Sequence, residues 1–371
     1  MLRIKAFQGL RPAPALVSEV ACVPYDVVDR EESAALAAGK PHSLLHVDRA
    51  EIDLPPDTDP YSDLVYAKAL ENFLALQKDG ALIRETEPCI YLYQQRLEVF
   101  RRRPAPVQLT WLGFPGTTGL DCFAARITDA WADPPGLTDA DFTESLARLA
   151  SGFLAYQPIT APPTHALLPP RSGSGNVTFG CFNNAAKIGR SALGLWAKTL
   201  AAVPNSRLVL KAHQLEDPLV ADDLRRLARA AGIPPAKVEL LPPVAAYTQH
   251  LQAYDGIDIA LDTFPYHGTT TSCEALLMGV PVVTLAGTTH ASRVGVSLLT
   301  RLGRPEFIAH DEAEFVAICR ALAADVPGLE ALRRGLRDEL MRSALCDAAP
   351  ITRDLEALFR SLSYRSGALN P

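Results

Sequence analysis

The sequence predicts an α/β protein whose C-terminal half is a doubly wound parallel sheet. From about residue 176 onward, apolar strand-like runs alternate with segments whose apolar residues recur at helical spacing. Repeated β–α units of this length are typical of a parallel sheet with helices on both faces. With 48% hydrophobic and 21% charged residues in 371, the chain has enough apolar side chains for a substantial core, which excludes an intrinsically disordered protein.

The charge balance and the first residues narrow the class of protein further. There are 36 basic and 42 acidic residues, a formal charge of −6, which argues against general nucleic-acid binding. The N-terminus has no apolar signal-peptide core, and no run of about 18 uncharged apolar residues occurs, so we expect a cytoplasmic protein without a membrane partner. The seven cysteines form no CxxC pair, so we expect them to be reduced.

The first 175 residues fall into two parts of different character. In residues 1–95, strands are expected at 20–28, 43–47 and 89–93, and helices at 30–38 and 61–79. In residues 96–175, strands are expected at 107–112 and 126–131, before a Pro-rich loop at 157–170. The Gly/Ser turn at 172–175 is the best candidate for a domain boundary.

The regular alternation begins after that turn. Strands are expected at 177–182, 207–212, 238–241, 257–262, 280–285 and near 307–309. Helices are expected at 191–203, 217–231, 244–254, 272–278 and 292–302, and then at 311–324, 328–344 and 351–362. We therefore expect four parts in the chain: residues 1–95, 96–175, 176–363 and a tail at 364–371.

The loops that follow strands at the carboxyl edge of a parallel sheet are where ligands bind. After the strand at 177–182, the amides of Asn183 and Asn184 and the amine of Lys187 precede a helix. The Lys187 ammonium could neutralise a phosphate as a flexible point charge. A lone loop lysine is more often an ordinary solvated side chain, and the spacing alone favours that second interpretation.

The loop after the strand at 257–262 is more informative, because it runs into a helix through the hydroxyl-rich residues 268–271. Free backbone N–H groups at a helix start, with the positive end of the helix dipole, form a cradle into which a diphosphate would fit. The alternative is a well-capped helix, since Thr271 as N-cap and Glu274 at N3 would make a capping box. Both interpretations fit the spacing equally.

Other candidate sites carry weaker signals. His250 could lie near the same edge, although a single histidine on an amphipathic helix is more often structural. Asp-x-Asp pairs at 57–59 and 139–141 match a pattern that holds manganese in many glycosyltransferases, but they arise easily by chance, and we expect no metal site. The glycine-rich stretch at 113–119 is neither GxGxxG nor a Walker A sequence, which excludes those nucleotide loops.

Five segments carry a resemblance to a known family. They are RPAPVQLTWLGFPGTTG at 103–119, FGCFNN at 179–184 with Lys187, LDTFPY at 261–266 with GTTT at 268–271, GVPVVTL at 279–285, and SRV at 292–294. In this order they resemble glycosyltransferase family 41, the O-GlcNAc transferases, and fit its bacterial members. The resemblance covers about residues 96–362.

This resemblance implies a fold and a reaction. The fold would be GT-B, two Rossmann-like lobes facing a cleft, with an incomplete N-terminal catalytic lobe here and a small α/β segment before it. The reaction would transfer N-acetylglucosamine from UDP-GlcNAc to a Ser or Thr hydroxyl, with inversion and without a metal or another cofactor. The partners would be the nucleotide sugar and a protein acceptor.

The resemblance also implies a role for each candidate residue. Lys187 would contact the diphosphate as the catalytic cation, Asn184 and His250 would hold the uridine, and Glu274 would meet the ribose where animal members carry Asp. Four residues would surround the phosphates: Gly268, Thr269, Thr270 and Thr271. Animal members carry a phosphate-contacting His at the position of Thr269, so we expect that contact to be weaker or different here.

Residues 1–95 resemble a different family, the domain of unknown function 1015, through segments at 3–14, 24–28 and 43–47. The tetratricopeptide repeats and most of the N-terminal catalytic lobe of family 41 are not found before residue 103. Beside an active transferase, two hypotheses therefore stay open. One is a catalytically impaired UDP- or UDP-sugar-binding protein or fusion product, and the other is a sugar epimerase.

Overall fold

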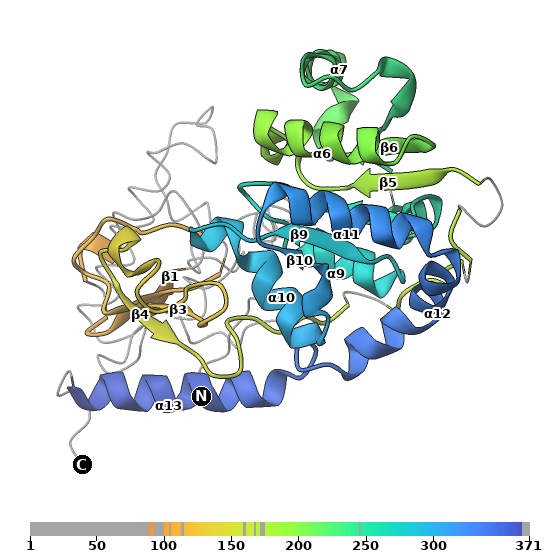
Figure 1. Cartoon of the computed structure of the whole chain (residues 1–371). Coiled ribbons are helices and arrows are strands. Elements are labelled where there is room, and N and C mark those ends of the chain that lie inside the picture. The colour runs from red at the N-terminus through yellow and green to blue at the C-terminus, as the bar shows by residue number, and fades with distance from the viewer. Residues whose placement is uncertain are drawn as a thin grey trace, which may run out of the picture. The chain divides into compact units, whose positions relative to one another are not determined.

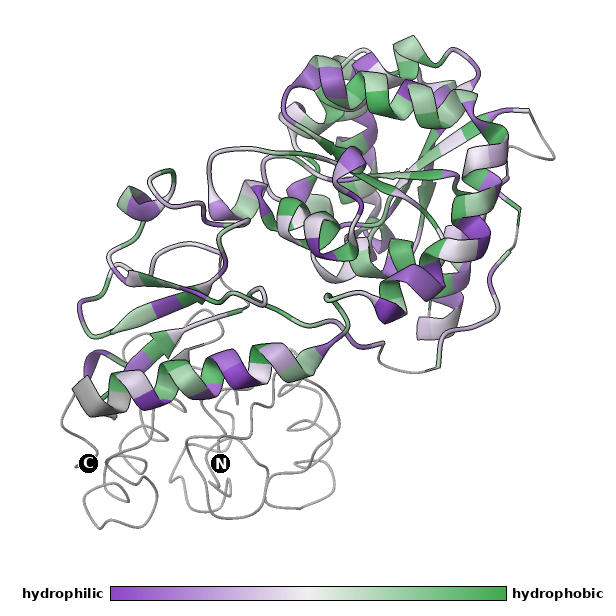
Figure 2. Cartoon of the chain, turned by 60° about the horizontal axis from the view of Figure 1, so that its bottom comes forward, coloured by the Kyte–Doolittle hydropathy of each residue, from purple (hydrophilic) through white to green (hydrophobic). Residues whose placement is uncertain are grey.

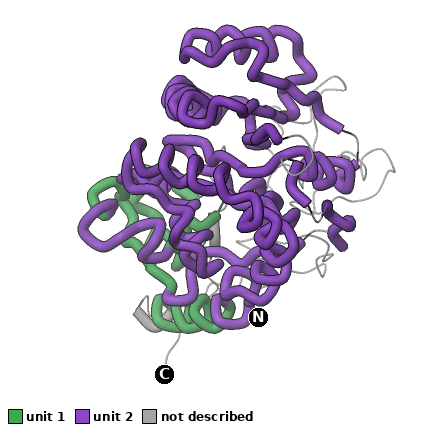
Figure 3. The backbone as a smooth tube through the Cα atoms, turned by 45° about the vertical axis from the view of Figure 1, so that its right-hand side comes forward, with its two compact units in different colours: residues 1–128, 139–149, 352–371 green, residues 129–138, 150–351 purple. Residues whose placement is uncertain are grey.

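The computed structural model describes residues 89–91, 100–103, 105–112, 115–158, 161–166, 168–170, 175–244 and 246–365 (Figure 1). The elements expected before residue 89 lie outside these residues, as does most of the turn expected at 172–175. The chain divides into two compact units, residues 1–128, 139–149 and 352–371, and residues 129–138 and 150–351 (Figure 3). The four-part division expected from the sequence stays a prediction.

The first unit contains a four-stranded parallel sheet. Its strands follow chain order: β1 (Cys89–Tyr91), β2 (Gln108–Thr110), β3 (Ala125–Thr128) and β4 (Ser145–Arg148). The first three confirm the strands expected at 89–93, 107–112 and 126–131. The sequence pattern does not predict β4, because its residues Ser-Leu-Ala-Arg contain no apolar run and none of them is buried. Most of helix α13 (Ala348–Arg365) also falls in this unit.

A buried carboxylate fixes the glycine-rich loop after β2. Glu144 accepts hydrogen bonds from the Thr117 hydroxyl at 2.7 Å, from the Thr118 backbone N–H at 2.7 Å, and from the Thr118 hydroxyl. Burial raises the pKa of Glu144, but these hydrogen bonds outweigh burial and lower the pKa overall. The described part of the stretch 113–119 is therefore a loop held in place by its own unit.

The second unit is built on a six-stranded parallel sheet in the order β10-β9-β8-β5-β6-β7 (Figure 1). The strands are β5 (Val177–Cys181), β6 (Ser206–Lys211), β7 (Val238–Leu241), β8 (Ile259–Leu261), β9 (Val282–Leu285) and β10 (Ile308–Ala309). The helices are α6 (Arg190–Ala202), α7 (Pro218–Ala230), α8 (Tyr247–Gln252), α9 (Thr270–Leu277), α10 (Val294–Leu302), α11 (Glu312–Ala324) and α12 (Val326–Arg342). Every strand and helix expected between 177 and 344 is present.

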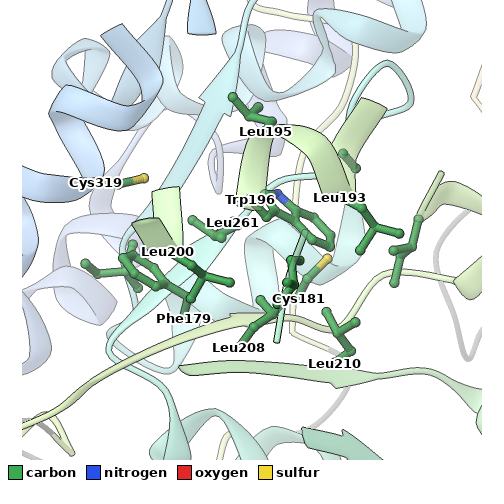
Figure 4. Close-up of a cluster of buried hydrophobic side chains, with 14 of the residues drawn as sticks. Phe179, Cys181, Leu193, Leu195, Trp196, Leu200, Leu208, Leu210, Leu261 and Cys319 are labelled. Carbon is green, nitrogen blue, oxygen red and sulfur yellow. The ribbon is translucent and has the colours of Figure 1, made fainter. Parts of the chain in front are cut away.

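Alternate residues of each strand point to opposite sides of this sheet. Because the residues on both sides are largely apolar, helices cover both faces. On one face, Phe179 of β5 and Trp196 of α6 belong to the main hydrophobic cluster, which also takes residues of α7 and α11 (Figure 4). On the other face, Ala260 and Val282 line a small cavity together with Ala275 of α9. The central strands are coloured mainly as hydrophobic and the helices alternate between polar and apolar (Figure 2). The doubly wound α/β fold is confirmed.

Several helices begin at other residues than expected, and three of these shifts bear on the site. α8 begins at Tyr247 rather than at 244, after Ala246 in an extended conformation, and α10 begins at Val294 after a 3-10 turn, His290–Ser292. α9 begins at Thr270 rather than at 272, which changes the role of its first residues, as described below. None of the helices in the described residues combines the length and apolar character that a membrane span requires.

A buried arginine joins α12 to the ends of neighbouring elements. Arg333 is 1% exposed, and its guanidinium donates hydrogen bonds to the backbone oxygens of Met278 at 3.0 Å, of Tyr254 at 3.3 Å, and of Ile257. Met278 directly follows α9, and the other two residues lie in and just after the 3-10 turn Ala253–Gly256. The guanidinium therefore donates to the carbonyls at these element ends, of which Tyr254 also accepts the Ile257 N–H.

Replacing Arg333 by leucine should lower the free energy of unfolding by about 3 kcal/mol or more, because the buried carbonyls of Met278 and Ile257 lose their side-chain donor and Tyr254 loses one of two donors. Urea denaturation followed by circular dichroism measures this loss. Arg334 is the matched control, since it is exposed and paired with Glu330. Arg334→Leu should change the free energy by less than about 0.5 kcal/mol. Equal losses in the two variants would contradict the role of Arg333.

Candidate functional site

The strand order of the second unit reverses between β5 and β8. Counted along the chain, β5, β6 and β7 run to one side and β8, β9 and β10 to the other, while β5 and β8 pair directly. In open parallel sheets, ligands bind outside the carboxyl ends of the strands at such a switch point. The loops after β5 and β8 are therefore the first place to look for a site.

Asp262 holds the loop after β8 in one conformation. One carboxylate oxygen accepts hydrogen bonds from the backbone N–H groups of Thr263 at 2.9 Å and Gly268 at 2.7 Å, and the other accepts the Thr284 hydroxyl of β9 at 2.8 Å. At Gly268 a Cβ atom would lie 2.6 Å from the Ser272 hydroxyl oxygen, so a larger residue would crowd the start of α9. Asp262 thus closes the loop and ties it to the next strand.

His267 fixes the same loop to β9 and α10. The Gly295 N–H donates to His267 Nδ1 at 3.0 Å, which places the ring hydrogen on Nε2, from where it bonds to the Leu285 backbone oxygen at 2.9 Å. The ring is fully buried, and burial lowers the pKa of His267 although Asp262, 3.6 Å from Nδ1, opposes this. The histidine is therefore a neutral structural bridge.

Lys187 brings the loop after β5 against the loop after β8. It ends the 3-10 turn Ala185–Lys187, and its ammonium donates to the His267 backbone oxygen at 2.8 Å and lies 3.9 Å from the centre of the Tyr266 ring. Burial lowers the pKa of Lys187, and Asp262 opposes the shift without forming an ion pair. Within the part of the chain that is described, no carboxylate pairs with this ammonium, so its charge is available to an anion.

α9 begins with open backbone N–H groups beside this lysine. Thr269 is its N-cap residue, and its side chain makes no capping hydrogen bond. The first hydrogen bond of the helix runs from the Cys273 N–H to the Thr269 backbone oxygen, so the N–H groups of residues 270–272 find no acceptor among the described residues. Such groups attract anions, and the helix dipole adds to the attraction.

The capping box over 271–274, one of the two alternatives that the spacing left open, is not formed. Because α9 begins at Thr270, Thr271 is already inside the helix, and its hydroxyl donates to Asn183 Oδ1 at 2.7 Å. The Glu274 carboxylate is buried and accepts hydrogen bonds from Tyr247 and His250 instead of from the backbone at the helix start. This leaves the helix start uncapped, as an anion-binding site requires.

Four side chains form a continuous polar chain, and we use that name for Lys211, His250, Glu274 and Tyr247. Lys211 Nζ lies 2.8 Å from His250 Nδ1, and His250 Nε2 lies 3.0 Å from Glu274 Oε2. The Tyr247 hydroxyl donates to Glu274 Oε1 at 2.9 Å. Burial lowers the pKa of Lys211 and raises that of Tyr247, and the Glu274 carboxylate stabilises the protonated form of each.

The structure brings most of the predicted site residues into these contacts. Lys187, Gly268 and Thr271 lie at the junction of the two loops, and His250 and Glu274 contact each other. The exposed Asn184 side chain accepts the Ala186 N–H at 2.9 Å and caps the 3-10 turn. The roles expected for all these residues in holding UDP stay predictions.

Sequence reasoning did not single out Asp262, His267, Lys211, Tyr247 or Tyr266. Asp262 and His267 belong to the same loop as the predicted phosphate cradle. The sequence pattern does not indicate that their side chains hold the loop in its conformation through hydrogen bonds. Lys211 ends a strand at the carboxyl edge of the sheet. The same rule that selected the loops after β5 and β8 could have found it.

The described residues hold no group of three or more His, Cys, Asp or Glu side chains that could bind a metal ion. Asp139 and Asp141 lie in a 3-10 turn, and Asp139 pairs with Arg148 at 2.8 Å. The other Asp-x-Asp pair, at 57–59, lies outside the described residues. Metal-independence stays a prediction.

Two family models match the sequence. The model of glycosyl transferase family 41 matches residues 78–157 and 168–355, which include every residue of the site described above. The chain belongs to glycosyl transferase family 41. The model of a protein of unknown function, DUF1015, matches residues 4–110, most of which lie outside the described residues.

Curated relatives and solved structures agree with this family. The probable UDP-N-acetylglucosamine–peptide N-acetylglucosaminyltransferase SPINDLY of rice is 45% identical over 303 residues, 78% of this chain and 32% of the rice protein. Its namesake in Arabidopsis thaliana is 46% identical over 265 residues, 70% of this chain and 28% of the relative. The chain thus spans about a third of the length of the curated relatives it matches.

Among solved structures, a mutant of the Thermobaculum terrenum O-GlcNAc transferase superposes with a TM-score of 0.72 at 35% identity. The match covers 84% of this chain and 60% of that one. The sucrose-phosphate synthase of Thermosynechococcus elongatus matches at 15% identity with a TM-score of 0.52, over 84% of this chain and 82% of that one, which concerns the fold alone. The expected GT-B class with a Rossmann-like parallel sheet is confirmed.

His267 should make the second compact unit, which contains it, less stable in mild acid. Its pKa is lowered in the folded state, so below a pH of about 6.5 the unfolded chain binds a proton that the folded chain does not. The free energy of unfolding should fall with decreasing pH, at up to about 1.4 kcal/mol per pH unit, until the folded-state pKa is reached. Urea denaturation at several pH values measures the slope.

The control for this experiment compares two variants. His267→Asn removes the titrating group, so its free energy of unfolding should depend less on pH than that of the wild type. His310→Asn changes an exposed histidine and should keep the wild-type slope. The same slope in all three proteins would contradict a special role of His267.

Proposed function

We propose that this chain is a glycosyltransferase that moves N-acetylglucosamine from UDP-GlcNAc to a Ser or Thr hydroxyl, with inversion and without a metal. The observation that carries the proposal is Lys187, a half-buried ammonium held against the loop that leads into the open start of α9. A fixed cation beside free helix N–H groups matches a diphosphate in charge and in hydrogen-bonding capacity. The names of the curated relatives support the sugar and the peptide acceptor.

In this proposal, Lys187 and α9 act on the leaving group. The acceptor hydroxyl oxygen attacks the anomeric carbon from the face opposite UDP and releases its proton to water, the bond to the β-phosphate oxygen breaks, and negative charge grows on that phosphate oxygen. Donors fixed in advance around such an oxygen stabilise the transition state more than the ground state. The His267 carbonyl uses one of the three Lys187 N–H bonds, which leaves two for phosphate oxygens.

The remaining candidate residues take the other parts of the nucleotide. Asn184 and His250 hold the uridine, and Glu274 accepts a hydrogen bond from the ribose. Each Glu274 oxygen already accepts one protein hydrogen bond and keeps a lone pair for a hydroxyl. The phosphates lie against four residues: Gly268, Thr269, Thr270 and Thr271.

Replacing Lys187 by alanine should weaken the binding of UDP by about 1.5–3 kcal/mol, the range of charge-assisted hydrogen bonds, which is roughly 10- to 150-fold in Kd. Isothermal titration calorimetry of the full chain measures the effect. Lys198→Ala is the matched control, because Lys198 is an exposed lysine on α6 that pairs with Glu312. A Kd for UDP that is equal in wild type and Lys187→Ala would remove Lys187 from the site.

Two further measurements decide between the proposal and its alternatives. Incorporation of labelled GlcNAc into peptides by the wild type, lost in Lys187→Ala, supports the transferase. UDP binding without incorporation supports a catalytically impaired UDP-binding protein, and turnover of UDP-GlcNAc without an acceptor supports an epimerase. Tighter binding of GDP than of UDP would overturn the assignment of uridine.

A further inference from the structure

We infer that Lys211 is a positioning residue of the nucleotide site: it holds the His250 imidazole with its hydrogen on Nε2 and so orients the Glu274 carboxylate. This inference rests on the proposed function, which places His250 and Glu274 against the nucleoside. It assigns a role to a buried lysine at the end of β6, whereas the residues discussed so far follow β5 and β8.

When Lys211 carries its charge, its contact with His250 has one direction. Lys211 is the last residue of β6 and is 6% exposed, and its Nζ lies 2.8 Å from His250 Nδ1. A protonated amine has three hydrogens and no lone pair, so Nζ donates and Nδ1 accepts. No carboxylate in the described part of the chain forms an ion pair with Lys211. Its direct polar partner is thus a neutral ring nitrogen.

This direction fixes the rest of the polar chain. With Nδ1 accepting, the hydrogen of the neutral ring lies on Nε2 and points at Glu274 Oε2, 3.0 Å away. The Tyr247 hydroxyl orients the other carboxylate oxygen. The opposite tautomer would set an N–H against the Lys211 ammonium and a lone pair against the Glu274 carboxylate, so two attractive contacts would become repulsive.

Aromatic neighbours fix the plane of the same ring. The His250 ring centre lies 5.7 Å from that of Tyr254, nearly perpendicular at 82°, and 6.1 Å from those of Tyr247 and Phe182. Apolar packing sets where the ring lies but does not distinguish its two nitrogens. The Lys211 ammonium supplies that distinction, as hydrogen-bonded partners do for metal-binding histidines.

The charges around His250 predict what happens when Lys211 is removed. The groups that face the ring are Lys211 from β6, Glu274 from α9, Tyr247 from α8 and Tyr254 from the turn after it. Without Lys211, the charged side chain that still contacts the ring among the described residues is Glu274. Nδ1 then loses the donor that selects the tautomer.

The experiment compares the wild type with Lys211→Met, Lys211→Arg and the control Lys198→Met. The imidazole ¹⁵N shifts of His250, assigned by their loss in His250→Gln, report which nitrogen carries the hydrogen. Calorimetric titration with UDP reports affinity. We expect the Nε2–H form in the wild type and the control, its loss in Lys211→Met, and a Kd for UDP raised about tenfold in that variant. Lys211→Arg keeps a donor and should restore both.

The outcomes separate this inference from the proposed function. An unchanged tautomer in Lys211→Met, or a changed tautomer with wild-type affinity, overturns the inference. If Lys211→Met does not fold, Lys211→Arg decides alone, since loss of the Nε2–H form beside a donor-only guanidinium also overturns it. The tautomer measurement needs no nucleotide, so a wild type that has the Nε2–H form but binds no UDP contradicts the proposed function instead.

Discussion

The buried carboxylate of Asp262 is the contact on which the candidate site depends. It accepts the N–H groups of Thr263 and Gly268 and the Thr284 hydroxyl, and so holds both ends of the loop after β8 against β9. That loop carries the backbone oxygen that Lys187 contacts, and it sets where α9 begins. Because an unpaired buried carboxylate is costly, the loop keeps this conformation for as long as the unit stays folded. The site is therefore formed before any ligand arrives.

The order of elements in the second unit follows from the sequence because its central strands are buried on both faces. A strand such as β5, buried along its whole length, is a mostly apolar run, Val-Thr-Phe-Gly-Cys, and such runs between amphipathic helices can be recognised in a sequence. β4 has no buried residue and leaves no such signal. The pairing of β5 with β8 is not readable either, since it depends on packing between segments far apart in the chain.

The sequence predicts which loops carry the candidate site, but not which side chains contact one another in it. Position at the carboxyl edge selected Lys187 and the residues before α9 without any knowledge of side-chain geometry. The capping box over 271–274 failed because a local pattern competes with tertiary partners: Glu274 bonds to Tyr247 and His250, which stand 27 and 24 residues earlier. The Lys211 contact spans 39 residues, a separation at which spacing in one sequence carries no information.

In the second unit, the arginines with a structural role and the lysines assigned to the candidate site differ in the number of hydrogen-bond acceptors around their charged groups. The Arg333 guanidinium meets three backbone carbonyls, and Arg301 meets those of Leu154 and Ala344, so both join elements together. Among the described residues, the half-buried Lys187 and the buried Lys211 each have one hydrogen-bond acceptor, an uncharged one, although removing an ammonium from water without a counter-charge destabilises the folded state. Selection for stability alone would replace such lysines by apolar residues. Their presence is explained by the proposed site, in which Lys187 beside the start of α9 binds the diphosphate and Lys211 positions His250.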